Sequence, residues 1–153
     1  MHRLFCPVNE PSALVAAKQC SELVTCRAGV QRHVGFASLF GGVAKVNMST
    51  GEIKMIYNGL APGNGAMLAT AGDLVFWGDL DQQFRAFDAV SGKTLWETTL
   101  QGTIQNSTIT YAVNGKQYVA VFTGEGLLTG GLIDQAGLHP MRHHDAVYAF
   151  ALP

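Results

Sequence analysis

Residues 86–96 read AFDAVSGKTLW, and this stretch decides the fold. Asp88 can accept backbone N–H groups as the chain turns, and Gly92 can adopt the left-handed conformation that closes the turn. Trp96 then lies on the outgoing strand, where its large ring is placed to pack against a neighbouring element. The stretch therefore predicts two antiparallel strands joined by a tight turn, with an aromatic residue that docks onto another part of the protein.

A weaker copy of this pattern precedes it, because residues 45–53 read KVNMSTGEI, 41 positions before residues 86–94. Asn47 stands in place of the aspartate and Met55 in place of the tryptophan. We expect this copy to keep the turn and to lose part of the aromatic packing. A repeat of this period is typical of propeller blades or of other repeated β-units.

Two β-hairpins are predicted around the second copy. Residues 73–78 are mostly apolar and residues 83–88 alternate aromatic with polar side chains, so these two runs should pair, with Phe84 facing inward. Residues 108–113 and 116–122 flank Asn114-Gly115. This dipeptide supplies the two positive φ values of a type I′ turn, which makes the second hairpin the clearer one.

The N-terminal region gives weaker signals. Residues 4–8 resemble a strand that Pro7 restricts to an edge or an end of a sheet, and the composition of residues 13–25 suits a short helix. Residues 124–131 contain four glycines and read as a flexible loop.

We expect one domain over residues 1–153, in which residues 1–40 are a poorly defined blade remnant and residues 41–153 are the β region. The fold class is all-β. The expected architecture is a partial β-propeller of two to three antiparallel blades with a tryptophan-docking motif formed by Asp88, Gly92 and Trp96.

Composition excludes several classes of function. Charged residues make up 14% of the 153 residues and hydrophobic ones 48%, and the formal net charge of -1 gives no general attraction to nucleic acid or to an anionic membrane. The three cysteines, Cys6, Cys20 and Cys26, form neither a disulfide framework nor a zinc-binding pattern. The first residues lack the apolar stretch of a secretory signal, so the chain as written is expected to stay in the cytoplasm.

Residues 86–96 resemble the tryptophan-docking motif of quinoprotein alcohol and methanol dehydrogenases. Residues 69–78, 114–121 and 147–153 resemble, in the same order, the strand before that motif, the hairpin after it and the usual end of the chain. The resemblance implies the C-terminal blades of a larger, periplasmic propeller that holds pyrroloquinoline quinone (PQQ) beside a calcium or lanthanide ion. It also implies that the general base and the acidic metal ligands belong to earlier blades, so the catalytic residues stay unknown here.

Two asparagines are the cofactor-binding candidates that the resemblance supplies. Asn9 matches a family asparagine that hydrogen-bonds the quinone. Asn64 stands where the family often has a tryptophan near the cofactor. Leu127 or Leu128 stands where the family often has another such tryptophan. These two departures weaken the expected PQQ pocket.

A second kind of site is suggested by residues 139–145, which read HPMRHHD. His143, His144 and Asp145 offer nitrogen and oxygen ligands to a metal ion, although a solvated loop before the last strand is an adequate explanation of the run.

Three functions therefore stay open. The chain is a structural propeller segment that joins copies of itself or other blades, a partial cofactor-binding unit that helps to oxidise an alcohol or sugar, or a calcium-dependent hydrolase such as a lactonase.

Overall fold

The computed structural model describes residues 22–28, 41–65, 67–105, 107–127 and 129–152. Within these ranges it contains ten strands and one helix: β1 (Glu22–Ala28), β2 (Gly41–Asn47), β3 (Ile53–Gly59), β4 (Leu68–Ala69), β5 (Leu74–Gly78), β6 (Gln83–Asp88), β7 (Thr94–Thr99), β8 (Thr108–Val113), β9 (Lys116–Thr123), α2 (Thr129–Ala136) and β10 (Ala146–Ala151).

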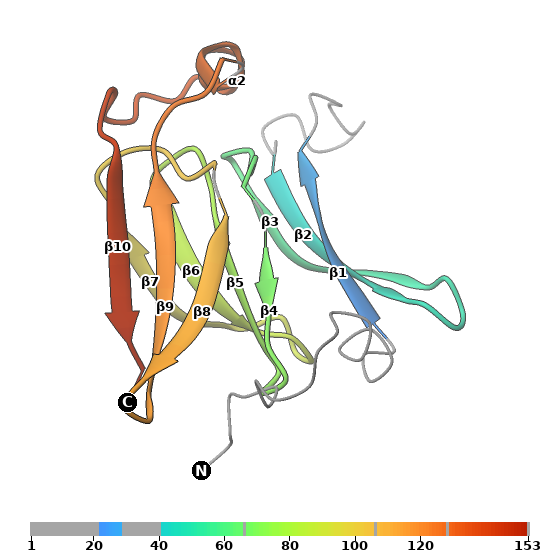
Figure 1. Cartoon of the computed structure of the whole chain (residues 1–153). Coiled ribbons are helices and arrows are strands. Elements are labelled where there is room, and N and C mark those ends of the chain that lie inside the picture. The colour runs from blue at the N-terminus through green and yellow to red at the C-terminus, as the bar shows by residue number, and fades with distance from the viewer. Residues whose placement is uncertain (1–21, 29–40, 66, 106, 128, 153) are drawn as a thin grey trace.

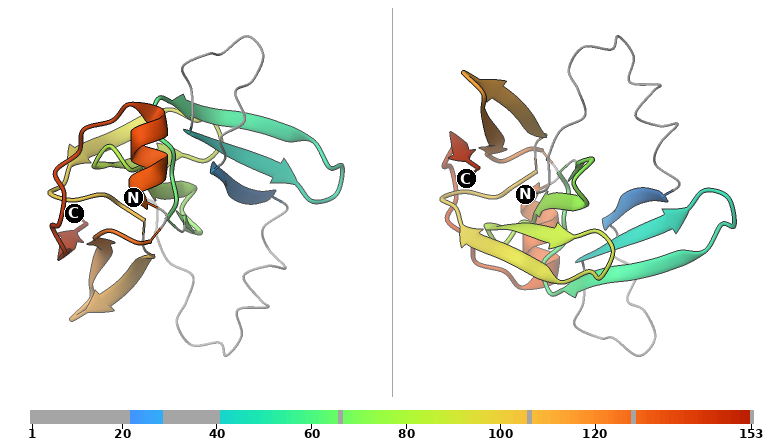
Figure 2. Two further views of the ribbon diagram at one scale, coloured as in Figure 1. Left: turned by 90° about the horizontal axis from the view of Figure 1, so that it is seen from above. Right: turned by 90° about the horizontal axis from the view of Figure 1, so that it is seen from below.

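The strands form three antiparallel sheets that follow one another in chain order (Figures 1 and 2). The first sheet has the order β1-β2-β3, the second β4-β5-β6-β7 and the third β8-β9-β10. The predicted all-β fold and partial propeller are confirmed.

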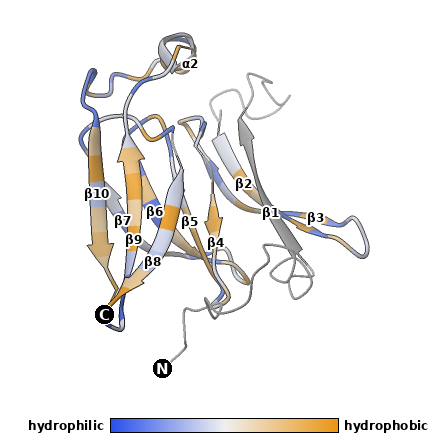
Figure 3. Cartoon of the chain, viewed as in Figure 1, coloured by the Kyte–Doolittle hydropathy of each residue, from blue (hydrophilic) through white to orange (hydrophobic). Residues whose placement is uncertain are grey.

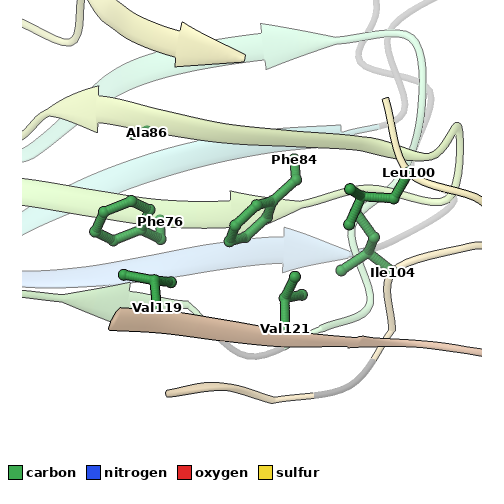
Figure 4. Close-up of a cluster of buried hydrophobic side chains, with 7 residues drawn as sticks. All are labelled: Phe76, Phe84, Ala86, Leu100, Ile104, Val119 and Val121. Atoms are coloured by element: carbon green, nitrogen blue, oxygen red, sulfur yellow. The ribbon is translucent and has the colours of Figure 1, made fainter. Parts of the chain in front are cut away.

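The second sheet lies between the other two and has a hydrophobic core on each face. Val75, Trp77 and Phe87 are buried in a cluster with residues of the first sheet. Phe76 and Phe84 belong to a second cluster, which Val119 and Val121 of β9 complete from the third sheet (Figure 4). Because neighbouring side chains of a strand point to opposite faces, β5 and β6 serve both cores at once.

Both predicted hairpins are confirmed. β5 pairs with β6 and places Phe84 in the core with no exposed surface, and β8 pairs with β9 across Asn114-Gly115. These two turn residues have φ values of 51° and 77°, as a type I′ turn requires.

Both copies of the turn motif close as the sequence predicts. Asp88 Oδ1 accepts hydrogen bonds from the backbone N–H and the hydroxyl of Ser91, at 2.6 and 2.7 Å, and Gly92 has a φ of 80°. In the first copy, Asn47 Oδ1 accepts from the N–H groups of Ser49 and Thr50, at 2.9 and 3.1 Å.

Two sequence predictions are corrected. The helix expected at residues 13–25 is wrong over its last four positions, because residues 22–25 belong to β1 and pair with β2; residues 13–21, like the strand predicted at residues 4–8, lie outside the described residues. The flexible loop expected at residues 124–131 instead runs into α2, which Ile133 anchors with only 2% of its surface exposed. No helix in the described ranges is long and apolar enough to cross a membrane.

Candidate functional site

The connections after β3, β5, β7 and β9 meet at one end of the three sheets, which we call the loop end (Figure 1). Backbone hydrogen bonds join each connection to the next. The N–H of Leu80 donates to Pro62, that of Ile104 to Asp79 and that of Gly124 to Thr103, at 3.0 to 3.1 Å. The loop end is therefore one continuous surface that crosses all three sheets.

Close packing fixes these connections. A Cβ atom at Gly63 would lie 2.2 Å from the ring of Trp77, and one at Gly102 would lie 2.2 Å from the carbonyl oxygen of His144. Only glycine fits at either position, so the backbone at the loop end is tightly positioned.

A cavity of about 630 Å³ opens at the part of the loop end that belongs to the third sheet. Its polar side chains include two carboxylates, from Glu125 and Asp145, and the amide of Gln105, while Phe122 and Val147 supply apolar surface. A cavity of this kind has acceptor groups for hydroxyl-bearing ligands and an excess of negative charge.

Glu125 is held as a carboxylate by three hydrogen bonds. Arg142 Nε and Nη2 donate to its two oxygens at 2.6 and 2.8 Å, and the backbone N–H of His143 donates to Oε1 at 2.9 Å. The Arg142 guanidinium, followed by the His143 N–H, lowers the pKa of Glu125 to about 2. Glu125 is thus a poor general base at neutral pH.

The amide of Gln105 also has its partners inside the protein. Its Nε2 donates to the carbonyl of Gly124 at 2.9 Å, and its Oε1 accepts a hydrogen bond from the hydroxyl of Thr129, a fully buried residue at the start of α2. These contacts hold α2 against the connection after β7, and each uses one of the two hydrogen-bonding positions on its amide atom.

The residues predicted from the sequence are not gathered into one site. Asn9 lies outside the described residues, and Asn64 is exposed at the loop end without lining the cavity. His143, His144 and Asp145 are all exposed, and of these three only Asp145 lines the cavity.

The described ranges contain no group of three His, Cys, Asp or Glu side chains placed to hold a metal ion. A metal role for His143, His144 and Asp145 stays a prediction.

A buried ion pair at the loop end has no local signature in the sequence. Arg85 Nη1 lies 2.6 Å from Asp79 Oδ2, with side-chain exposures of 10% and 3%, and Arg85 Nε lies 2.7 Å from the exposed Glu97. Burial raises the pKa of Asp79, although Arg85 acts in the opposite direction.

This ion pair shapes the connection after β5. Asp79 Oδ1 accepts the backbone N–H groups of Asp81 and Gln83, both at 3.0 Å, and the Arg85 guanidinium lies 5.0 Å from the ring centre of Tyr57 on β3. The pair therefore positions backbone and links the first two sheets.

Comparisons with known proteins agree with this architecture. The family model of the PQQ-containing glucose, ethanol and alcohol dehydrogenase β-propeller domain matches residues 29–119. The dehydrogenase subunit of a quinone-linked alcohol dehydrogenase from Gluconobacter oxydans is 40% identical over 99 residues, which is 62% of this chain and 13% of that protein. A cytochrome c-linked 1-butanol dehydrogenase from Thauera butanivorans is 39% identical over 93 residues, which is 61% of this chain and 13% of the relative.

A solved structure, the europium-containing methanol dehydrogenase, superposes with a TM-score of 0.65 and 26% sequence identity. The match covers 78% of this chain and 24% of the methanol dehydrogenase. The aligned part thus spans only about an eighth of the length of the two curated relatives, at 13% of each, and about a quarter of the solved structure.

Proposed function

Because the chain belongs to the β-propeller family of the PQQ-dependent glucose, ethanol and alcohol dehydrogenases, we propose that it supplies the last blades of such a propeller. Its own role is structural, and oxidation requires the remaining blades. The observation that carries this proposal is the stacking of three sheets through the two apolar faces of β5 and β6. This stacking supports the proposal because each unit of a repeating array buries its faces against its neighbours.

The described part of the loop end does not fit PQQ by itself. PQQ is a planar quinone with three carboxyl groups, whereas the cavity presents the carboxylates of Glu125 and Asp145. The neighbouring cation, Arg142, is already engaged by Glu125 at 2.6 Å. Like charges would oppose an anionic cofactor here.

The quinone contacts of the assembled propeller would therefore come mainly from other blades, with Asn9 and Asn64 as this chain's candidate contributions. The ligands of the calcium ion that the family resemblance implies would likewise come from other blades, because the described residues hold no three-ligand group for a metal ion. The reaction of the whole propeller would be the oxidation of a small alcohol or sugar.

The hydrolase alternative gains no support from the cavity. Glu125 would have to act as a base or as a calcium ligand, and its two oxygens are already paired with Arg142. No observation on the described residues favours lactone opening.

Cofactor loading tests the proposal directly. The purified chain is incubated with PQQ and Ca²⁺ and passed through gel filtration, and quinone absorbance and dye-linked alcohol oxidation are measured beside an intact quinone-linked alcohol dehydrogenase. We expect the intact enzyme to retain the quinone and this chain to retain none. Retained quinone with dye reduction would contradict a purely structural role, and lactone hydrolysis that EDTA abolishes would instead support the hydrolase.

Assembly is tested by complementation. A quinone-linked alcohol dehydrogenase that lacks the segment matched by this chain is produced together with the chain. We expect recovery of quinone binding and of alcohol oxidation. The matched control is Trp96→Asp, which places a charge at the contact between the second and third sheets and should prevent recovery.

A further inference from the structure

The sequence contains three Asn-Gly pairs, and their backbones differ. Asn114-Gly115 forms the two-residue turn between β8 and β9, which lies at the end of the third sheet opposite α2 (Figure 3). Asn58-Gly59 ends β3 and pairs with residues 41–42 of β2, and Asn64-Gly65 lies on irregular backbone at the loop end. At an Asn-Gly pair the asparagine side chain cyclises readily onto the next backbone nitrogen, because glycine has no side chain to hinder the attack.

Cyclisation at Asn114 needs only water. The Gly115 nitrogen gives its proton to water and attacks Asn114 Cγ. A bond forms between these two atoms, the bond from Cγ to Nδ2 breaks, and the amide nitrogen takes up a proton and leaves as ammonia. The resulting succinimide ring then adds water at either of its two carbonyl groups. Opening at one carbonyl gives aspartate at position 114, and opening at the other gives isoaspartate, in which the main chain runs through Cγ.

The turn at Asn114 is already close to the geometry that the ring requires. For an L residue, Cγ reaches the next nitrogen when ψ is about −120°, which is the ψ of the first residue of a type II′ turn. The φ of 51° at Asn114 suits types I′ and II′ alike, because both have a φ of about +60° at this residue. Rotation of the peptide between Asn114 and Gly115 therefore converts one turn into the other, and both turns are compatible with the paired strands.

Gly115 permits this rotation. Its φ of 77° becomes negative in a type II′ turn, which glycine accepts at no steric cost, and no described atom lies within 4 Å of the place of a Cβ. Its N–H has no hydrogen-bond partner among the described residues, since the ladder ends at the pair of Val113 and Lys116. Both turn residues are exposed, so water reaches the nitrogen and the ring.

Asn58 has the same following residue and is also exposed, but its backbone is held in a strand. An antiparallel strand has a ψ of about +135°, so ring formation at Asn58 requires a rotation of about 100°, which removes Asn58 from the ladder with β2. Gly59 is buried, and a Cβ there would lie 2.5 Å from the hydroxyl oxygen of Tyr57. The backbone therefore separates two pairs that the sequence makes equivalent.

We propose that Asn114 is a site of spontaneous succinimide formation in the folded chain, which converts it into aspartate and isoaspartate. β8 and β9 stay paired while the ring forms. The isoaspartyl product adds a methylene group to the main chain, so the two-residue turn is lost and the register that it sets is loosened. Because Val119 and Val121 of β9 belong to the core between the second and third sheets, this loosening weakens the contact between the sheets. The reaction requires no cofactor and no other blade, so it is independent of the proposed function.

The full chain is kept at pH 8 in buffer and, in parallel, in concentrated urea, where every Asn-Gly pair loses its backbone geometry. Pepsin digestion in acid stops the reaction, and mass spectrometry measures the rate at each asparagine against synthetic aspartyl and isoaspartyl peptides. We expect the rates at Asn114 and Asn58 in urea to agree within about twofold. In buffer the rate at Asn114 should stay within about threefold of its value in urea, whereas the rate at Asn58 should fall at least about tenfold, because Asn58 reacts only after local opening of β3.

Hydrogen–deuterium exchange tests whether the strands stay paired. Weakly acidic buffer preserves the succinimide, and this chain is lighter than the parent by one ammonia. We expect residues 108–113 and 116–123 of the succinimide chain to exchange as slowly as in the parent, and those of the isoaspartyl chain to exchange faster. The matched control is Asn114→Asp, which carries the carboxylate without the extra methylene group and should exchange like the parent.

Equal slowing of Asn114 and Asn58 by folding would overturn the inference, and so would a succinimide chain in which β8 and β9 have lost their protection. An isoaspartyl chain that exchanges like Asn114→Asp would overturn the loosening of the hairpin. Because no step contains PQQ or Ca²⁺, these results are separate from the outcome of cofactor loading.

Discussion

The indole of Trp96 meets the ring of Phe150 edge-on, with ring centroids 5.1 Å apart and ring planes at 69°. This contact joins β7 of the second sheet to β10 of the third. Phe150 also stacks on Phe84 at 6.0 Å, so one ring connects to two strands of the neighbouring sheet.

Phe150→Ala should therefore destabilise the chain by about 2–3 kcal/mol, because it removes apolar burial and two aromatic contacts. Urea unfolding followed by circular dichroism measures the change. Tyr111→Ala is the matched control, since Tyr111 stacks on Tyr118 of the same sheet at 5.3 Å and is 39% exposed. Its cost should be about 1 kcal/mol or less. Equal costs for the two variants would show that the contact between the sheets adds nothing.

The two copies of the turn motif allow the effect of the contact between Gly92 and β3 to be separated from the effect of backbone strain. Gly92 and Gly51 have φ values of 80° and 75°, so alanine is strained at both. A Cβ at Gly92 would lie 2.9 Å from the carbonyl oxygen of Ile56 on β3, whereas one at Gly51 would have no neighbour within 4 Å.

We expect Gly51→Ala to cost about 1 kcal/mol and Gly92→Ala about 1 kcal/mol more, measured by chemical unfolding of both variants side by side. The difference between the two variants reports the contact between the first and second sheets. If the two substitutions lower the stability by the same amount, the close approach of Gly92 to Ile56 does not contribute to the contact between the first two sheets.

The features predicted correctly depend on residues that are close in sequence. The Asn114-Gly115 turn and the bonds from Asp88 to Ser91 lie within single hairpins, so composition and spacing were sufficient to predict them. The partners across sheets were not predictable in this way. Nothing in the sequence near Trp96 indicates that its ring meets Phe150, because that contact depends on how two sheets stack.

The corrected elements and the missed site residues share one physical cause. The composition of residues 13–25 taken together suits a helix, but pairing with β2 places residues 22–25 in a sheet. Gly130 and Gly131 disfavour a helix, but α2 is held by the buried Ile133 and by the hydroxyl of Thr129. Tertiary contacts override local preference in both cases.

The pairs Glu125–Arg142 and Asp79–Arg85 likewise join residues that no motif links, and Glu125 and Arg142 are 17 positions apart. Sequence reasoning therefore found neither pair.

The ion pair of Arg85 gives a third prediction. Arg85→Leu leaves Asp79 buried without its cation, which should destabilise the chain by about 3 kcal/mol. Glu97→Gln removes the exposed partner of the same arginine and should cost less than about 1 kcal/mol. Thermal and urea unfolding measure both changes. A large effect of Glu97→Gln with a small effect of Arg85→Leu would reverse the assignment of the buried and exposed partners.

The pairing of Glu125 with Arg142 predicts how stability depends on pH. The pKa of Glu125 falls from 4.5 to about 2 in the folded chain, so the unfolded carboxyl takes up a proton at higher pH than the folded one. The stabilising contribution is therefore complete above about pH 4.5 and is lost as the pH falls to about 2.

Glu125→Gln should lower the melting temperature at pH 7, and its difference from the wild type should shrink through this window and vanish near pH 2. Thermal unfolding at pH 7, 5, 4, 3 and 2 measures the profile. The Arg142→Gln and Glu125→Gln/Arg142→Gln variants complete a double-mutant cycle, in which a non-additive effect isolates the pair. The Arg142 side chain is 40% exposed, so 1 M salt should reduce the effect at pH 7. A difference between Glu125→Gln and wild type that stays constant with pH would show that Glu125 stabilises the loop end by packing and not by its charge.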